Sequence, residues 1–110
     1  MNKAIDINEL LDIMDGDQDL VKDCFDDFLV ECNNMLGQIE DAIAESNPDT
    51  IEKTAHALKG SLIYLAATDA AEIASELESL GKKKEVAGAF KVFSNLSLAC
   101  EGVKDFMRNY

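Results

Sequence analysis

Apolar residues recur at intervals of four and three along most of this 110-residue chain, and this spacing constrains the fold more than any other feature. The longest run of the repeat is Val21, Phe25, Phe28, Cys32, Met35, Ile39 and Ala42. Such spacing keeps one face of an α-helix apolar. The chain has a single proline, no alternating β-branched run and no Asn-Gly hairpin turn, which argues against strands. The sequence therefore predicts an all-α protein.

A short helix is expected before the long one. Ile7, Leu10, Leu11 and Met14 share the helical spacing. Asp6 precedes them, with Glu9 three residues later as in a capping box, and we expect this helix to end near Gly16.

Three more helices are expected after the long one. In "SNPDT", Asn47 can cap a helix and the following proline is tolerated at the first helical position, so a third helix is expected to start there. Its apolar residues are Ile51, Ala55, Leu58, Leu62 and Leu65. We expect Thr68 to cap a fourth helix with Gly81 at its end. The apolar face of the fifth helix is expected to comprise Val86, Phe90, Phe93, Leu96, Cys100, Val103 and Met107.

These helices favour one packing. Four amphipathic helices joined by short loops, plus a short leading helix, predict an antiparallel up-down four-helix bundle with an additional N-terminal helix. A chain of this length with 47% hydrophobic residues fits a single domain over residues 1–110.

Acidic residues are unevenly distributed along the chain. Residues 1–49 contain 14 Asp or Glu against two Lys, whereas residues 50–110 contain eight acidic and eight basic residues, so the whole net charge of −12 lies in the first part. A surface of this sign repels phosphates, which argues against nucleic acid or an anionic membrane as a partner. We expect most of these carboxylates to be solvated helix surface.

Nothing in the sequence predicts export or membrane insertion. The chain has no run of 18 apolar residues, and "MNKAIDINELL" has acidic residues where a signal peptide needs a basic lead. We therefore expect a cytoplasmic protein whose three cysteines are small buried hydrophobes. Met1 and the compact ends favour a free protein, although a module of a longer chain stays open.

The only histidine lies in "TAHALKGS", inside the expected third helix. At about 100° per residue, the apolar residues of this helix share a sector of roughly 80°, and His56 lies about 140° from its centre. We therefore expect His56 to point towards solvent. Its neighbours on this outward face, three, four and seven positions away, are Glu52, Lys53, Lys59, Gly60 and Ile63.

Gly60 lies one turn after His56, within the same expected helix. Glycine at an exposed helical position costs about 1 kcal/mol relative to alanine, and packing within the bundle does not obviously require it there. We infer that the missing side chain leaves room for a large partner to approach His56. Lys59 supplies a positive charge that can balance an anion held on the imidazole.

An exposed imidazole is a competent nitrogen nucleophile at cytosolic pH, so His56 can accept a phosphoryl group and release it again. A Ser-His-Asp triad is disfavoured because G-x-S-x-G is missing, and a zinc site because no Cys or His stands at ligand spacing from His56. The chain also has no Gly-rich nucleotide loop, which argues against a histidine kinase.

"AHALKGS" and the following "LIYLAATDAAEIASELE" resemble the signature of the histidine phosphotransfer (HPt) domain family, written H-x-L-K-G-S, then L-G-A, then L-x-x-L-E. Family members are helical bundles of about this size with the phosphorylated histidine midway along a long helix, so the resemblance covers essentially the whole chain. Two positions depart from the pattern. Ala66 stands where the family often has Gly before Ala67, which leaves the loop geometry open, and Leu62 stands where the family often has a second serine.

The resemblance implies roles for individual residues. His56 would be the phosphoacceptor, attacking through the ring nitrogen farther from the backbone. Lys59 would stabilise the phosphate, and Gly60 would leave room for the partner. The residues expected to contact the partner are Glu52, Lys53 and Ile63.

The resemblance also implies an activity and its partners. The protein would be a phosphocarrier without kinase activity of its own, in a multistep two-component phosphorelay. It would take a phosphoryl group from a receiver-domain aspartate, of a hybrid sensor histidine kinase, and pass it to the receiver of a downstream regulator. The receiver would bind the Mg²⁺ used in transfer, so we expect no cofactor or metal on this chain. The alternative is a helical interaction or adaptor module in which His56 is not phosphorylated.

Overall fold

The computed structural model describes residues 4–110, so residues 1–3 of the expected domain lie outside the described residues. Its helices are α1 (Ile7–Ile13), α2 (Gln18–Ala44), α3 (Pro48–Tyr64), α4 (Thr68–Lys82) and α5 (Ala89–Arg108), with a short 3-10 helix η1 (Val86–Gly88) before α5. No strand occurs in this described part of the chain. The all-α prediction is confirmed.

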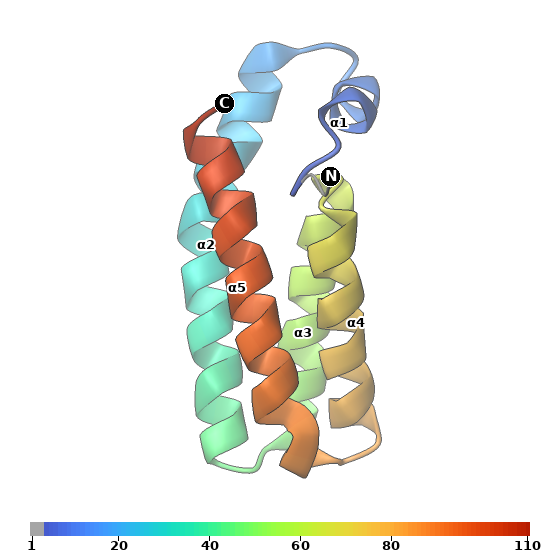
Figure 1. Ribbon diagram of the computed structural model, residues 1–110, viewed down its shortest axis with the longest axis vertical. Coiled ribbons are helices and arrows are strands. Elements are labelled where there is room, and N and C mark those ends of the chain that lie inside the picture. The colour runs from blue at the N-terminus through green and yellow to red at the C-terminus, as the bar shows by residue number, and fades with distance from the viewer. Residues whose placement is uncertain (1–3) are drawn as a thin grey trace.

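The four long helices lie side by side along the long axis of the molecule (Figure 1). The α2–α3 and α4–α5 connections lie at one end, and the α3–α4 connection lies at the other end, near α1 (Figure 1). α3 packs against α2 and α4, and α5 packs against the same two helices, so α3 and α5 occupy diagonal positions. This arrangement leaves the outer face of α3 open.

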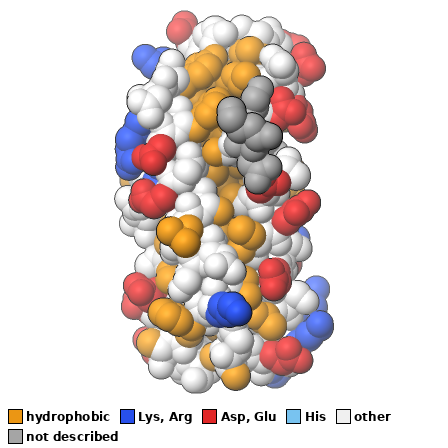
Figure 2. All heavy atoms as spheres, viewed as in Figure 1, with side chains coloured by type: hydrophobic (Ala, Val, Ile, Leu, Met, Phe, Trp, Pro, Cys, Tyr) orange, Lys and Arg blue, Asp and Glu red, His pale blue; other side chains and the backbone are white. Residues whose placement is uncertain are grey.

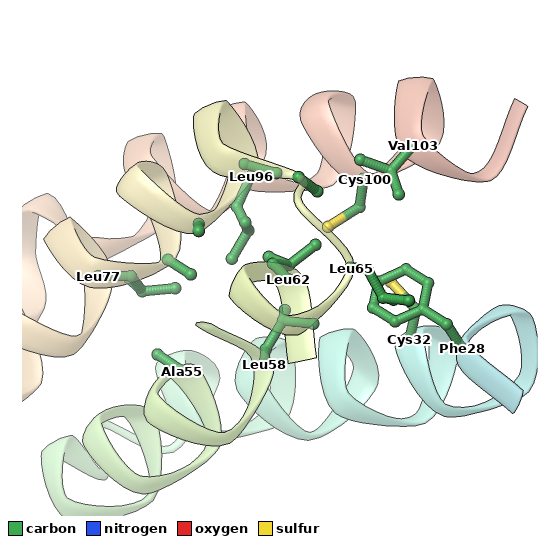
Figure 3. Close-up of a cluster of buried hydrophobic side chains, with 14 of the residues drawn as sticks. Phe28, Cys32, Ala55, Leu58, Leu62, Leu65, Leu77, Leu96, Cys100 and Val103 are labelled. Carbon is green, nitrogen blue, oxygen red and sulfur yellow. The ribbon is translucent and has the colours of Figure 1, made fainter. Parts of the chain in front are cut away.

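The apolar stripes meet in one core between the long helices. Figure 3 shows side chains of α2, α3, α4 and α5 converging there, among them Phe28, Cys32, Leu58, Leu62, Leu77, Leu96, Cys100 and Val103. Leu58, Leu62 and Leu77 are fully buried, and burial of each such side chain contributes about 1.5–3 kcal/mol. Two of the three cysteines are buried as expected, and Cys24 is half-buried.

Two of the expected helix starts are confirmed. The backbone N–H of Glu9 donates to Asp6 Oδ1 at 3.1 Å, and that of Thr50 donates to Asn47 Oδ1 at 3.2 Å. The second half of a capping box does not form at α1, because the Asp6 N–H donates instead to the Ala66 carbonyl at 3.0 Å. This bond fastens the chain before α1 to the α3–α4 connection.

The expected bounds of the fourth helix are wrong at both ends. Ala67 is the N-cap residue of α4, and it has no side-chain capping bond, whereas Thr68 is the first helical residue. Gly81 is buried inside the helix, and Lys84 with φ 60° makes the left-handed turn after it. A Cβ on Gly81 would lie 2.7 Å from the backbone nitrogen of Glu52, so this glycine is required by the close approach of α4 to α3.

The expected burial of Phe90 is also wrong, because its side chain is 60% exposed. Val86 lies in η1, which has a tighter turn than an α-helix and shifts the phase of the repeat before α5 begins. Ala89 and Val92 take the buried positions instead.

The loop after α3 keeps the conformation that glycine usually provides. Ala66 has φ 59°, and the N–H of Ala67 donates to the Leu62 carbonyl at 2.8 Å, which is the bond that ends a helix in a left-handed cap. Alanine costs about 1 kcal/mol in this conformation. The departure at Ala66 therefore leaves the loop geometry intact.

The surface is rich in carboxylates. On the face seen in Figure 2, which has α5 at its front, acidic side chains lie along the margins and apolar side chains lie between them. No helix within residues 4–110 combines the length and the apolar content that crossing a membrane requires.

Candidate functional site

His56 lies in the middle of α3 with its side chain 66% exposed. The residues that bury the opposite face of α3 are Ile51, Ala55, Leu58 and Leu62. The outward orientation expected for His56 is therefore confirmed. A core role for this histidine is excluded by its exposure.

Glu78 of α4 holds the imidazole from one side. The Nδ1 atom of His56 lies 2.9 Å from Glu78 Oε2. Because an ionised carboxylate can only accept, the shared proton is on Nδ1 and the imidazole donates it. In the neutral ring, Nε2, the nitrogen farther from the backbone, then carries the free lone pair.

Lys59 binds the other oxygen of the same carboxylate, since its Nζ atom lies 2.7 Å from Glu78 Oε1. The hydrogen bond from Lys59 holds the pKa of Glu78 below its ordinary value. Burial acts in the opposite direction and raises this pKa, whereas the hydrogen bond from His56 lowers it further. The shift extends the pH range over which Glu78 is ionised to more acidic values. Glu78 thus links the histidine to the lysine. While His56 carries no phosphoryl group, Glu78 balances the positive charge of Lys59.

Gly60 leaves an open surface one turn along from the imidazole. Apart from Gly60, its two chain neighbours and the adjacent backbone of α3, no described atom lies within 4 Å of the position that a Cβ on Gly60 would take. The glycine is therefore not required by packing within the protein, unlike Gly81. This open surface is compatible with the access role inferred from the sequence.

A shallow groove of about 390 Å³ lies between α3 and α4 beside the imidazole. Its walls are Glu52, Lys53, His56, Glu78 and Lys82. Two of the expected partner contacts, Glu52 and Lys53, thus lie together with His56. The third, Ile63, is 57% exposed and lies about two turns further along α3, outside this groove.

Glu78 and Lys82 were not assigned any role from the sequence. Glu78 ends the "SELE" stretch, where the family pattern has the glutamate of L-x-x-L-E, so a signal for it was present. Lys82 opens the run "KKK", which gives no sign that its first lysine lies beside His56.

The arrangement is that of an exposed nitrogen nucleophile. A neighbouring carboxylate fixes its tautomer, a lysine lies close by, and the approach is unobstructed. Within residues 4–110, no three His, Cys, Asp or Glu side chains are grouped so that they could hold a metal ion.

A comparison with models of protein families matches residues 23–106 to the Hpt domain. The match covers most of α2 and all of α3 and α4, and it therefore includes His56 and Glu78. Searches of the curated proteins and of the solved structures gave no match.

Proposed function

Because the chain belongs to the Hpt domain family, we propose that it carries phosphoryl groups on His56 between the receiver domains of a multistep phosphorelay. Hpt domains are phosphocarriers in two-component signalling, and they are not kinases. The single observation that carries the assignment to His56 is the exposed imidazole whose Nδ1 is bound to Glu78, which leaves Nε2 free. Its direction of transfer and its particular receivers are part of the proposal.

In the proposed step, the Nε2 lone pair of His56 attacks the phosphorus of a receiver aspartyl phosphate. The Nε2–P bond forms, the P–O bond to the aspartate breaks, and the aspartate leaves as a carboxylate. The reacting form is the neutral ring with its proton on Nδ1, so no proton has to be removed from Nε2. Delivery to the next receiver is the reverse reaction with a different aspartate.

Glu78 and Lys59 act on the charge that this step creates. Phosphorylation of Nε2 makes the ring cationic, and the Glu78 carboxylate 2.9 Å from Nδ1 stabilises that charge. Lys59 is half-buried and paired with Glu78, and a phosphoryl group on Nε2 would compete with Glu78 for its ammonium. We therefore assign Lys59 to phosphate stabilisation and Glu78 to positioning of the ring.

The receiver approaches over the bare surface at Gly60 and contacts Glu52, Lys53 and Ile63. The exposed isoleucine suits an apolar contact at the centre of the interface. The receiver brings the Mg²⁺ that neutralises charge during transfer, and this chain contributes no cofactor. The proposed donor is the receiver of a hybrid sensor histidine kinase, and the acceptor is the receiver of a downstream regulator.

The proposal treats residues 1–110 as one cytoplasmic domain built as an antiparallel up-down bundle. The alternating ends of the helix connections in Figure 1 support this arrangement of the four long helices. The rigid bundle would hold His56 and Glu78 in register through the packing of α4 on α3.

The test uses a receiver domain whose aspartate carries a radiolabelled phosphoryl group, incubated with this protein and Mg²⁺. We expect the label to move to the wild type and not to His56→Gln, and to be labile in acid as N-linked phosphate is. Label on both proteins in equal amounts would contradict the assignment. Label on neither, with every receiver of the same genome, would favour the alternative of a helical adaptor module.

A further inference from the structure

The outer face of α5 carries apolar side chains that the described part of the chain leaves uncovered. Leu98, near the middle of the helix, is 73% exposed, and Phe90, near its start, is 60% exposed. Apolar side chains lie along the middle of this face (Figure 2). α5 packs against α2 and α4 with its inner face and lies diagonally opposite α3, so its outer face takes no part in the chemistry proposed for His56.

The charge of α5 distinguishes it from the other helices. α5 contains three basic and two acidic residues, whereas α2 contains one basic and seven acidic residues, and α4 contains one basic and four acidic residues. α3 is neutral apart from its histidine. A chain with a net charge of −12 repels a second copy of itself over most of its surface, and this repulsion is weakest at α5.

The charges on the outer face of α5 are placed symmetrically about Leu98. Lys91 lies seven residues before Leu98 and Asp105 lies seven residues after it, and all three side chains are exposed. Positions seven apart in a helix form one stripe that drifts by only about 20° per repeat. When two α5 helices pack antiparallel with their Leu98 side chains in contact, Lys91 of each copy faces Asp105 of the other. The face is therefore complementary to itself, as a two-fold interface requires.

Both charged side chains are available for this pairing. Within residues 4–110, Lys91 has no ion-pair partner within 4 Å. Arg108 binds Oδ1 of the Asp105 carboxylate at 3.2 Å, and Oδ2 can accept from a second cation. The ion pair with Arg108 therefore does not have to break when a second copy binds.

Gly102 lies one turn after Leu98, at an exposed position. Apart from its chain neighbours and the adjacent backbone of α5, no described atom lies within 4 Å of the position that a Cβ on Gly102 would take. Glycine at an exposed helical position costs about 1 kcal/mol relative to alanine, and packing within the chain does not require it there. In the antiparallel pair, Gly102 lies opposite Ser94, which is four residues before Leu98. Two small residues at this level allow the helices to approach closely.

We propose that the outer face of α5 binds a second copy of this chain, in an antiparallel two-fold dimer centred on Leu98 and flanked by two Lys91–Asp105 ion pairs. Both His56 faces stay open in this dimer, because α3 lies diagonally opposite α5. Neither the contact nor its test depends on the proposed function.

The size of the contact predicts a weak dimer. α5 has 20 residues and is thus about 30 Å long, and a contact along one such helix buries less than the about 800 Å² per partner of a standard interface. We expect a Kd of about 100 μM. The chain is then monomeric at the low micromolar concentrations of circular dichroism.

The test is sedimentation equilibrium between about 10 μM and about 1 mM protein, with charge reversals at the two ends of the stripe. Lys91→Glu and Asp105→Lys each place like charges opposite one another, so each should weaken the dimer at least tenfold. The double variant restores opposite charges and should return to within about threefold of the wild type. Net charge alone predicts a different result, because Asp105→Lys makes the chain less negative and would then strengthen the dimer.

Two further variants locate the contact. Lys53→Glu makes the same change in net charge as Lys91→Glu on the exposed surface of α3, and it should stay within about twofold of the wild type. Leu98→Gln removes the apolar centre and should leave the protein monomeric at about 1 mM. Circular dichroism checks that each variant is folded.

The outcomes that would overturn the proposal are distinct. A wild type that stays monomeric at about 1 mM would show that this face does not bind a second copy. A wild-type dimer that Leu98→Gln leaves intact, or that Lys53→Glu and Lys91→Glu weaken equally, would place the contact elsewhere. A double variant that is as weak as the single variants would contradict the antiparallel pairing of Lys91 with Asp105.

Discussion

Replacing Gly60 by leucine should make the protein more stable and a poorer phosphocarrier at the same time. A Cβ at this position meets no described atom within 4 Å, and the same holds for Gly102 of α5. α5 lies diagonally opposite α3, so Gly102→Leu is a matched control that leaves the His56 face unchanged.

The size of both effects follows from the exposed helical setting. Leucine has a helix propensity better than that of glycine by about 0.8 kcal/mol, so each variant should unfold about 3–6 °C higher than the wild type. A leucine forced into a close-packed interface costs about 1–3 kcal/mol, which corresponds to a complex with the receiver that is roughly 5- to 150-fold weaker. Only Gly60→Leu should show this second effect.

Thermal unfolding followed by circular dichroism measures the first effect, and the rate of transfer from a phosphorylated receiver measures the second. Unchanged transfer in Gly60→Leu would refute the argument that Gly60 permits close approach. A lower unfolding temperature in Gly60→Leu than in the wild type would show that the glycine is required by the fold after all.

Three further substitutions test other parts of the site. Gly81→Ala should lower the free energy of unfolding by about 1–3 kcal/mol, because its Cβ would lie 2.7 Å from the Glu52 backbone nitrogen, and a urea midpoint at or above that of the wild type would contradict this. Glu78→Gln should slow transfer and lower stability at neutral pH by less than about 1 kcal/mol. The pKa of Glu78 is lowered from 4.5 in the folded protein, so its contribution to the free energy of unfolding is fully present above pH 4.5 and disappears as the pH falls through the lowered pKa. The urea midpoints of Glu78→Gln and the wild type should therefore converge in acid. A difference that persists in acid would refute the ion-pair account. Lys59→Ala should slow transfer with its helicity retained, and a large loss of the helical signal would mean that the lysine is needed for folding.

The positions of the helices could be predicted because they depend on local information. The four-three spacing fixed which face of α3 is buried, and the caps at Asp6 and Asn47 are bonds between residues three apart. The outward orientation of His56 follows from the same spacing. The error at Phe90 has a local cause as well, since one 3-10 turn is enough to shift the phase of the repeat.

The contacts between helices could not be predicted in this way. Glu78 is 22 residues from His56 in the sequence, and only the packing of α4 on α3 brings it to Nδ1 while Glu76 stays exposed. Gly81 looked like a helix end, because nothing near it in the sequence indicates that the backbone of α3 approaches it. The partner of His56 and the reason for Gly81 are two results of the same close packing.

The central claim is that Nε2 of His56 accepts the phosphoryl group while Nδ1 keeps its proton. His56 is the only histidine in the chain, so NMR of protein with ¹⁵N-labelled histidine gives one ring whose signals need no further assignment. After reaction with a phosphorylated receiver, we predict ³¹P–¹⁵N coupling at Nε2 and a protonated Nδ1. Phosphorus on Nδ1, or no phosphorus on the ring, would contradict the account.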